Sequence, residues 1–219
     1  MRRRAAGAVD PFAPRTEGVE IKVYDRAYFD RWYRDPARRI ATPRDVARKT
    51  AMVVGIAEAL LQRPVRSLLD VGCGEAPWRA ALHAVRPGAR YVGVDSSEYV
   101  VRRFGAARNI RLGAFGTLGA LNFRGKFDVV VCCDVLQYVP TPELRTGLAA
   151  ISVMLGGVAY LEAYTTSDEI EGDRKAWHER SPAQYRRAFT TSGLTGVGMQ
   201  CWVGDTLKPM TTALERAER

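Results

Sequence analysis

Hydrophobic and polar positions along the chain follow two different periodicities. Short runs of apolar and often β-branched residues predict buried strands. We expect such strands at residues 66–71, 90–95, 109–112, 127–134, 157–164 and 196–203. Between them, apolar residues recur every three or four positions, as they do on one face of a helix. These segments predict helices at residues 43–61, 77–85, 98–105, 141–155, 181–191 and 207–219.

Strands that alternate with helices and are apolar throughout indicate a parallel sheet covered on both faces. The sequence therefore predicts a single doubly wound, mostly parallel α/β sheet of six or seven strands over residues 64–219. Residues 19–63 are expected to form an N-terminal helical cap, in which Thr42 and Pro43 supply the start signals of the longest helix. Residues 1–18 show no periodicity and are expected to form a flexible basic leader.

Aromatic residues cluster at the start of the cap. Tyr28 and Trp32 are four residues apart, as are Phe29 and Tyr33, so on a helix they form one stripe. Such a stripe serves either as core packing under the sheet or as a lid over a ligand, and the sequence alone leaves both interpretations open.

Composition limits the class of protein. The chain is 47% hydrophobic and 26% charged, which is typical of a folded globular domain. No stretch approaches twenty apolar residues, and no apolar run follows the basic start, so we expect neither a membrane span nor a secretory signal. The four cysteines form no C-x-x-C pair and there are only two histidines, so no metal site is expected. Together these features favour a reduced, cytoplasmic protein.

The net charge of +9 is concentrated at the N-terminus. Residues 1–50 hold 13 Lys and Arg against 7 Asp and Glu, a net charge of +6. A basic arm of this kind binds nucleic acid or simply remains solvated. No aromatic–basic interleaving accompanies the charge, so we favour the solvated arm and expect no nucleic-acid partner.

The first predicted strand ends in a glycine-rich turn. Asp70 stands two residues before Gly72, Gly74 follows, and a helix begins at once. Such a turn lets backbone N–H groups approach a ligand closely. Asp95 ends the next strand, 23 residues after Gly72, where a carboxylate typically binds ribose hydroxyls. The pattern predicts a nucleoside-cofactor site.

Two common nucleotide motifs do not fit this turn. The third glycine of a dinucleotide-binding G-x-G-x-x-G would fall at Pro77, and no P-loop lysine follows. The turn instead resembles the first motif of class I S-adenosylmethionine-dependent methyltransferases. Three segments carry the resemblance, in the family's order: residues 69–74 (LDVGCG), 91–97 (YVGVDSS) and 127–139 (FDVVVCCDVLQYV). It extends over roughly residues 20–204 and implies a Rossmann-like fold with S-adenosylmethionine as cofactor.

The resemblance also implies roles for individual residues. The expected cofactor-binding residues are Asp70, Gly72, Cys73, Gly74, Asp95, Ser96, Phe115, Asp134, Val135, Leu136, Arg48 and Trp32. Among them, Asp95 would bind the ribose, Ser96 would lie against the adenine and Arg48 would reach the methionine carboxylate. Asp134 and Leu136 would line the wall near the sulfonium, and the aromatic stripe would form a lid.

Two positions depart from the family pattern. Ala76 stands where many members have glycine, which costs little if its φ is negative. No acidic residue follows the third strand to accept a hydrogen bond from the adenine, so recognition there would depend on the backbone and on packing by Phe115 or Leu118.

The motifs do not identify the methyl acceptor, because the cofactor supplies the activated group and the protein supplies orientation. His178 and Tyr138 are the candidate catalytic residues. The sequence lacks the N-P-P-[YF] pattern of nucleic-acid and protein N-methyltransferases, so we expect a small-molecule acceptor methylated at oxygen or nitrogen. An RNA- or protein-directed methyltransferase and a non-catalytic cofactor-binding subunit stay as alternatives. The oligomeric state is open, a homodimer included.

Overall fold

The computed structural model describes residues 22–39, 41–169, 173–214 and 216. The expected leader over residues 1–18 lies outside them. Within the described residues, one seven-stranded sheet has the order β3-β2-β1-β4-β5-β7-β6. The strands are β1 (Ser67–Val71), β2 (Arg90–Asp95), β3 (Ile110–Leu112), β4 (Phe127–Cys133), β5 (Leu155–Glu162), β6 (Thr195–Gly196) and β7 (Cys201–Val203). Strands β1 to β5 pair in parallel, whereas β7 runs antiparallel to both of its neighbours.

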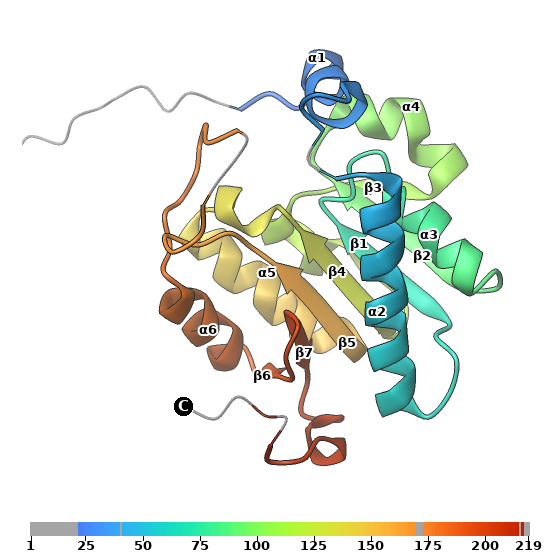
Figure 1. Ribbon diagram of the computed structural model, residues 1–219, viewed down its shortest axis with the longest axis vertical. Coiled ribbons are helices and arrows are strands. Elements are labelled where there is room, and N and C mark those ends of the chain that lie inside the picture. The colour runs from blue at the N-terminus through green and yellow to red at the C-terminus, as the bar shows by residue number, and fades with distance from the viewer. Residues whose placement is uncertain (1–21, 40, 170–172, 215, 217–219) are drawn as a thin grey trace, which may run out of the picture.

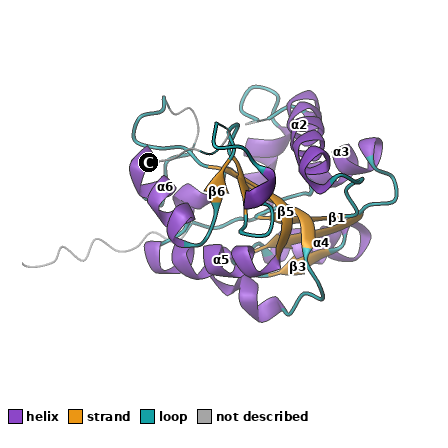
Figure 2. Cartoon of the chain, turned by 90° about the horizontal axis from the view of Figure 1, so that it is seen from below, coloured by secondary structure: helices purple, strands orange, loops and turns teal. Residues whose placement is uncertain are grey.

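Helices cover both faces of the sheet (Figure 2). The α-helices are α1 (Arg26–Phe29), α2 (Pro43–Leu61), α3 (Pro77–Val85), α4 (Glu98–Arg108), α5 (Thr141–Met154) and α6 (Pro182–Thr191). Shorter turns of helix are the π-type η1 (Asp30–Arg34) and the 3₁₀-type η2 (Phe115–Leu121), η3 (Leu136–Tyr138) and η4 (Lys208–Met210). Helices α2, α3 and α4 pack on one face, while η2, α5 and α6 pack on the other.

The two faces follow from the period-two alternation of strand side chains. Leu68 packs with α2 and α3, and its neighbour Leu69 packs with α5 and η2. Both side chains are fully buried. A strand buried on both faces has no position for solvated side chains, which explains the continuous apolar runs in the sequence.

Helix starts lie where the sequence predicts them. Thr42 accepts a hydrogen bond from the backbone N–H of Asp45, whose carboxylate accepts one in return, and Pro43 occupies the first turn. Ser181 and Gln184 form the same reciprocal pair at the start of α6. Each pair satisfies backbone donors that have no partner within the helix.

Two expectations for the C-terminal part are wrong. The segment 196–203 is not one strand: β6 and β7 form an antiparallel hairpin around a turn in which Gly198 has φ +92°. The expected helix over residues 207–219 is absent from its described part, which holds only η4 and turns. Residues 212–214 are exposed, so a helix there would bury no apolar face against the sheet, and short helices without such packing are only marginally stable.

The observed architecture is the doubly wound α/β fold expected from the sequence. Its strand order reverses direction between β1 and β4, and in open α/β sheets ligands bind at that point, beyond the carboxyl ends of the strands. Helix α1 lies beyond this edge (Figure 1). No helix in the described ranges is long and apolar enough to cross a membrane. The division of the chain at residue 63 stays a prediction.

Candidate active site

The glycine turn, residues 72–76, needs its glycines for two reasons. Gly72 and Gly74 have φ values of +70° and +51°, in the left-handed region that glycine adopts at low cost. A Cβ on Gly72 would overlap a methyl group of Val135, and one on Gly74 would stand 2.6 Å from the Tyr33 hydroxyl. The turn is fixed to the sheet because the Gly72 N–H donates to the carbonyl of Val94 at 2.8 Å.

Asp95 lies beside this turn at the end of β2. Its Oδ2 accepts the N–H of Gly74 at 2.7 Å, and its Oδ1 accepts the N–H of Ser97 at 2.8 Å. Burial raises the pKa of Asp95, against these two hydrogen bonds. A carboxylate oxygen has more than one acceptor position, so each can still accept a hydroxyl.

Asp70 points toward the face that α3 covers. It is buried, and its Oδ2 accepts the hydroxyl of Tyr91 at 2.7 Å. Burial raises the pKa of Asp70 to about 7, despite that hydrogen bond. The side chain thus changes charge near neutral pH.

Ala76 does not meet the condition under which alanine would cost little at this position. Its φ is +58°, not negative, and it precedes Pro77 at the start of α3. For an L-residue other than glycine this conformation costs roughly 1–2 kcal/mol. The alanine therefore holds a strained position that glycine would occupy freely.

Asp134, at the end of β4, is a second strained residue, with φ +58°. Its N–H donates to the carbonyl of Glu162 at 3.2 Å, and its carboxylate accepts the amide of Gln137. Burial raises the pKa of Asp134 to about 6, against the hydrogen bond from Gln137. Non-glycine residues in this region of φ are concentrated at functional sites.

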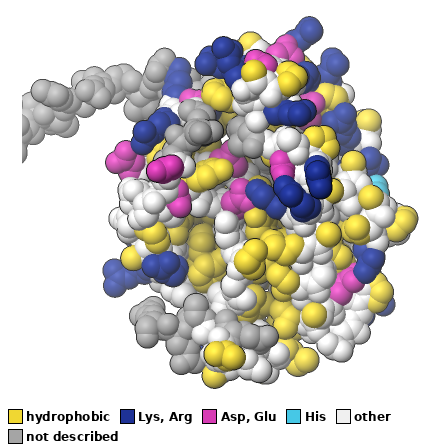
Figure 3. Space-filling view, viewed as in Figure 1, with side chains coloured by type: hydrophobic (Ala, Val, Ile, Leu, Met, Phe, Trp, Pro, Cys, Tyr) yellow, Lys and Arg dark blue, Asp and Glu magenta, His cyan; other side chains and the backbone are white. Residues whose placement is uncertain are grey.

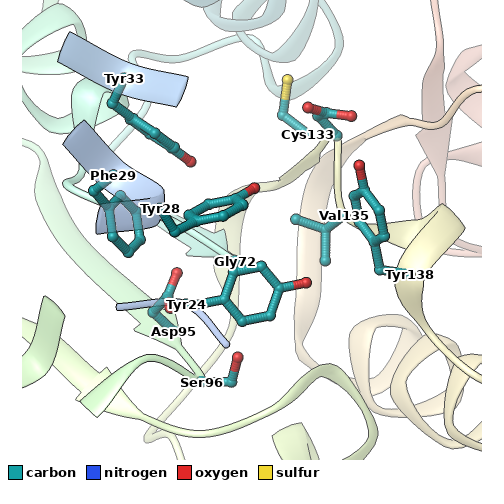
Figure 4. A pocket seen from close by; sticks show the side chains of 11 residues that line it. Tyr24, Tyr28, Phe29, Tyr33, Gly72, Asp95, Ser96, Cys133, Val135 and Tyr138 are labelled. Carbon is teal, nitrogen blue, oxygen red and sulfur yellow. The ribbon is translucent and has the colours of Figure 1, made fainter. Parts of the chain in front are cut away.

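An aromatic roof, formed by Tyr24, Tyr28, Phe29 and Tyr33, lies over the turn (Figure 4). Tyr28 packs edge-on against both Tyr24 and Phe29, with centroids 5.0 and 5.4 Å apart. Phe29 is 2% exposed and stacks on Tyr99 of α4. Phe29 is thus core packing, and the tyrosines line the cavity at the carboxyl edge of the sheet, while the lid over a ligand stays a prediction.

Two cavities meet under the roof. The small cavity, of about 90 Å³, is bordered by Asp95 and Ser96, by the roof and by Val135 and Tyr138. The main cavity, of about 460 Å³, extends from Asp70 and Cys73 to the ends of β4 and β5. Four residues line both: Tyr33, Gly72, Cys133 and Asp134. Charged side chains of both signs gather on this upper part of the molecule (Figure 3).

Most of the residues expected to bind cofactor border these cavities. Those that line at least one of them are Trp32, Asp70, Gly72, Cys73, Asp95, Ser96, Asp134 and Val135. Gly74 donates to Asp95 and contacts Tyr33, so it lies in the same site. Tyr138 lines the small cavity, but its hydroxyl donates to the carbonyl of Asp173 at 2.7 Å. Burial raises the pKa of Tyr138 far above its usual range, so its hydroxyl keeps its proton at neutral pH.

Four expected residues are not brought to the site. The Arg48 side chain is exposed and pairs with Asp45 on its own helix. His178 is exposed and lines neither cavity. Phe115 and Leu136 are buried in the core on the α5 face. Phe115 contacts Gly147 there, Leu118 is also buried, and neither lines one of the two cavities.

The structure adds an ion pair that the sequence analysis missed. Lys49 Nζ lies 2.6 and 2.8 Å from the two carboxylate oxygens of Glu162, and both residues line the main cavity. The hydroxyl of Tyr160 also donates to Glu162. Lys49 follows Arg48 in the sequence, but the helix turns it toward the sheet. The sequence does show that Glu162 lies near the end of a predicted strand. It does not show that Lys49, 113 residues away, would be its partner.

Comparison with known proteins fits this geometry. The family profile described as "Methyltransferase domain" matches residues 9–197, so the chain belongs to the S-adenosylmethionine-dependent methyltransferases. No curated protein sequence matches significantly.

Solved structures share the fold at low sequence identity. DesVI of Streptomyces venezuelae is 18% identical and superposes with a TM-score of 0.57, over 73% of this chain and 92% of DesVI. Magnesium protoporphyrin IX methyltransferase of Synechocystis PCC 6803, solved with bound SAH, is 19% identical with a TM-score of 0.57, over 79% and 89% of the two chains. The amino pentose methyltransferase CalS10 of Micromonospora echinaspora, solved with SAM, is 18% identical with a TM-score of 0.54, over 70% and 86%.

Proposed function

We propose that this methyltransferase transfers a methyl group from S-adenosylmethionine to an oxygen or nitrogen atom of a small molecule. The main cavity is the observation that carries the proposal. Its volume of about 460 Å³ falls within the range of small-molecule sites, and it borders the glycine turn at one end and Glu162 at the other. Its walls are largely apolar, with Trp32 and Trp78 facing a few polar groups.

The residues present suit the cofactor. Asp95 offers free acceptor positions to the ribose hydroxyls, and Gly72, which has no side chain, lines both cavities where the amino-acid end would lie. Asp70, Cys73 and Asp134 would line the path between the two cavities. Tyr33 lines both cavities and stands against Gly74, so it would have to move as the cofactor enters. When bound, the cofactor supplies a methyl group activated by a positively charged sulfur.

In this proposal, Asp134 would accept a proton from the acceptor. It lines both cavities, so it faces the cofactor turn and the acceptor space at once. A pKa of about 6 leaves it ionised at pH 7.5 and makes it a stronger base than an ordinary carboxylate. The Lys49–Glu162 pair at the far wall would position the acceptor through hydrogen bonds.

The test is formation of S-adenosylhomocysteine with a panel of small alcohols, phenols and amines. We expect turnover of at least one class, with kcat/KM rising as the pH passes through about 6. Asp134→Asn should lower kcat by about 100-fold, within the range of general-base effects, and leave the affinity for S-adenosylhomocysteine within threefold. Asp205→Asn, an exposed substitution outside both cavity walls, is the matched control. Cofactor binding without turnover across broad panels would contradict the proposal.

Two neighbours act on small molecules by their printed names, a magnesium protoporphyrin and an amino pentose. At 18–19% identity these neighbours support a small-molecule acceptor for this chain only by analogy.

A further inference from the structure

The ammonium of Lys22 lies among three tyrosine rings. Its Nζ is 3.5 Å from the ring centroid of Tyr138 and 5.4 and 5.3 Å from those of Tyr24 and Tyr28. It also lies 3.0 Å from Oδ2 of Asp173. We call these four residues around Lys22 the tyrosine cage.

The cage is built to hold a cation without water. The Lys22 side chain is only 6% exposed, and a buried ammonium is costly unless it is paired. The ring faces and the Asp173 carboxylate supply that compensation, and cation–π contacts strengthen when they are desolvated. Burial lowers the pKa of Lys22, although Asp173 opposes the change.

The carboxylate of the cage is held in place independently of Lys22. The N–H of Lys175 donates to Oδ1 of Asp173 at 2.9 Å, and the Tyr138 hydroxyl donates to the carbonyl of Asp173 at 2.7 Å. If Lys22 left, three aromatic faces and an oriented carboxylate would still converge on one point.

The cage adjoins the candidate active site. Its three tyrosines also line the small cavity, together with Asp95, Ser96 and Asp134 (Figure 4). The cage tyrosines line the small cavity and not the main one, so an acceptor whose charged group lies in the cage would have to extend past Asp134, which lines both cavities, to reach the main cavity.

We propose that the tyrosine cage binds the positively charged group of the methyl acceptor, a small amine, and that Lys22 fills the cage as an internal ligand until the acceptor displaces it. The inference rests on the proposed function, because it assumes a small-molecule acceptor. Tethering gives Lys22 an effective concentration on the order of millimolar, so the intact protein binds a free cation weakly.

Calorimetry with choline tests the cage itself. Its neutral analogue 3,3-dimethylbutan-1-ol has the same shape without the charge. Removing the tethered competitor in Lys22→Ala should tighten choline binding at least tenfold over the unaltered protein, with no such gain for the neutral analogue. The double variant Lys22→Ala/Tyr138→Leu should lose that gain. Lys126→Ala, at an exposed lysine away from the cage, should behave as the unaltered protein.

Thermal melting shows whether each variant is folded, and Lys22→Arg keeps a cation in the cage and should bind choline no better than the unaltered protein. A folded Lys22→Ala variant that fails to bind choline, or binds both probes equally, overturns the proposal.

Turnover separates this inference from the proposed function. With paired amine and alcohol acceptors, we expect amines to be preferred and choline to compete with them. Turnover of neutral acceptors alone, unaffected by choline, would refute the cage as acceptor subsite and leave the methyltransferase function intact. An absence of turnover with every acceptor would refute the proposed function, whatever choline does.

Discussion

The floor and the roof of the candidate site are held by different kinds of contact. The floor, formed by the glycine turn with Asp70 and Asp95, is joined to the sheet by hydrogen bonds that involve the backbone or buried carboxylates. The roof is held by side chains: ring contacts, the hydrogen bond from Ser97 Oγ to the carbonyl of Tyr24, and Lys22 with Asp173. A floor joined to the sheet is expected to hold a cofactor in one position, whereas the side-chain contacts of the roof are ones that a single substitution can remove.

The pH dependence of the floor gives the largest expected effect. The pKa of Asp70 is raised to about 7, so the folded protein keeps a proton that the unfolded chain releases near pH 4. Stability should therefore fall as the pH rises from about 4 to about 7. Asp70→Asn should remove this loss. The difference in unfolding free energy between the variant and the unaltered protein should therefore shift in favour of the variant by on the order of 4 kcal/mol between pH 4 and pH 8.

Urea unfolding across this pH range measures the difference. Asp128→Asn is the control of opposite sign: burial acts to raise the pKa of Asp128, but Arg63 and the backbone lower it overall. That variant should lose stability at pH 7. Parallel pH profiles for Asp70→Asn and the unaltered protein would show that Asp70 is not perturbed.

Gly72→Ala, which alters the floor, should give the second largest loss of stability. The new methyl would overlap Val135 and the residue would hold φ +70°, which together cost about 3 kcal/mol. Affinity for S-adenosylhomocysteine should fall more than tenfold, because the turn moves. Gly55→Ala, within α2 and with open space around it, should instead stabilise by about 0.5–1 kcal/mol. Equal effects of the two substitutions would contradict the assignment.

Asp95→Ala tests the ribose contact of the floor. Loss of charge-assisted hydrogen bonds should weaken binding of S-adenosylmethionine and S-adenosylhomocysteine by about 100-fold, or about 2.7 kcal/mol. Titration calorimetry measures it, with Asp205→Ala as the exposed control. Unchanged affinity in a folded Asp95→Ala variant would rule out the ribose contact.

Arg180→Met should lower the free energy of unfolding by about 2 kcal/mol through the segment around η3, which carries Tyr138 at the edge of the small cavity. Arg180 is 6% exposed and donates to the carbonyls of Leu136 and Val139 at 3.1 and 2.6 Å, which would lose their partner. Affinity for S-adenosylhomocysteine should change less than threefold, because the floor is untouched. Arg187→Met, at an exposed position on α6, should be neutral. A large loss of affinity would show that the floor and the segment around η3 are coupled.

Ala76→Gly should give the smallest effect, within about 0.5 kcal/mol. Relief of the left-handed strain offsets the lost methyl burial and the greater chain entropy of glycine. Ala57 is also buried but lies within α2, so Ala57→Gly has no strain to relieve and should cost more than about 1 kcal/mol. Similar losses in urea unfolding would mean that the turn is unstrained.

Local patterns were enough to predict most elements and the floor. Helix α3 and strand β2 have the predicted bounds, because a proline start and a continuous apolar run are local signals. The C-terminal hairpin was missed because β6 has only two residues and depends on pairing with β7. Two-residue strands carry no periodicity of their own.

Candidate residues outside the turn were harder to assign from sequence. Arg48 and Lys49 are adjacent and both basic, yet only Lys49 lines the main cavity, since neighbours on a helix point about 100° apart. Phe115 was expected at the adenine. Its ring instead packs against Gly147, where the absence of a side chain leaves room for it in the core. Which side chain reaches the site depends on which helices and strands pack together, and the sequence of a single segment does not contain that information.

The sequence by itself determined the doubly wound fold, the family and the glycine turn with its two acids. These depend on local periodicity, on glycine at positive φ and on short spacings, which any chain with this sequence carries before it folds. Only the tertiary structure decided that Ala76 and Asp134 take left-handed conformations, that Lys49 meets Glu162, and that Lys22 enters a cage of tyrosines. Those contacts join residues up to 151 positions apart, and packing brings them together only once the sheet has formed.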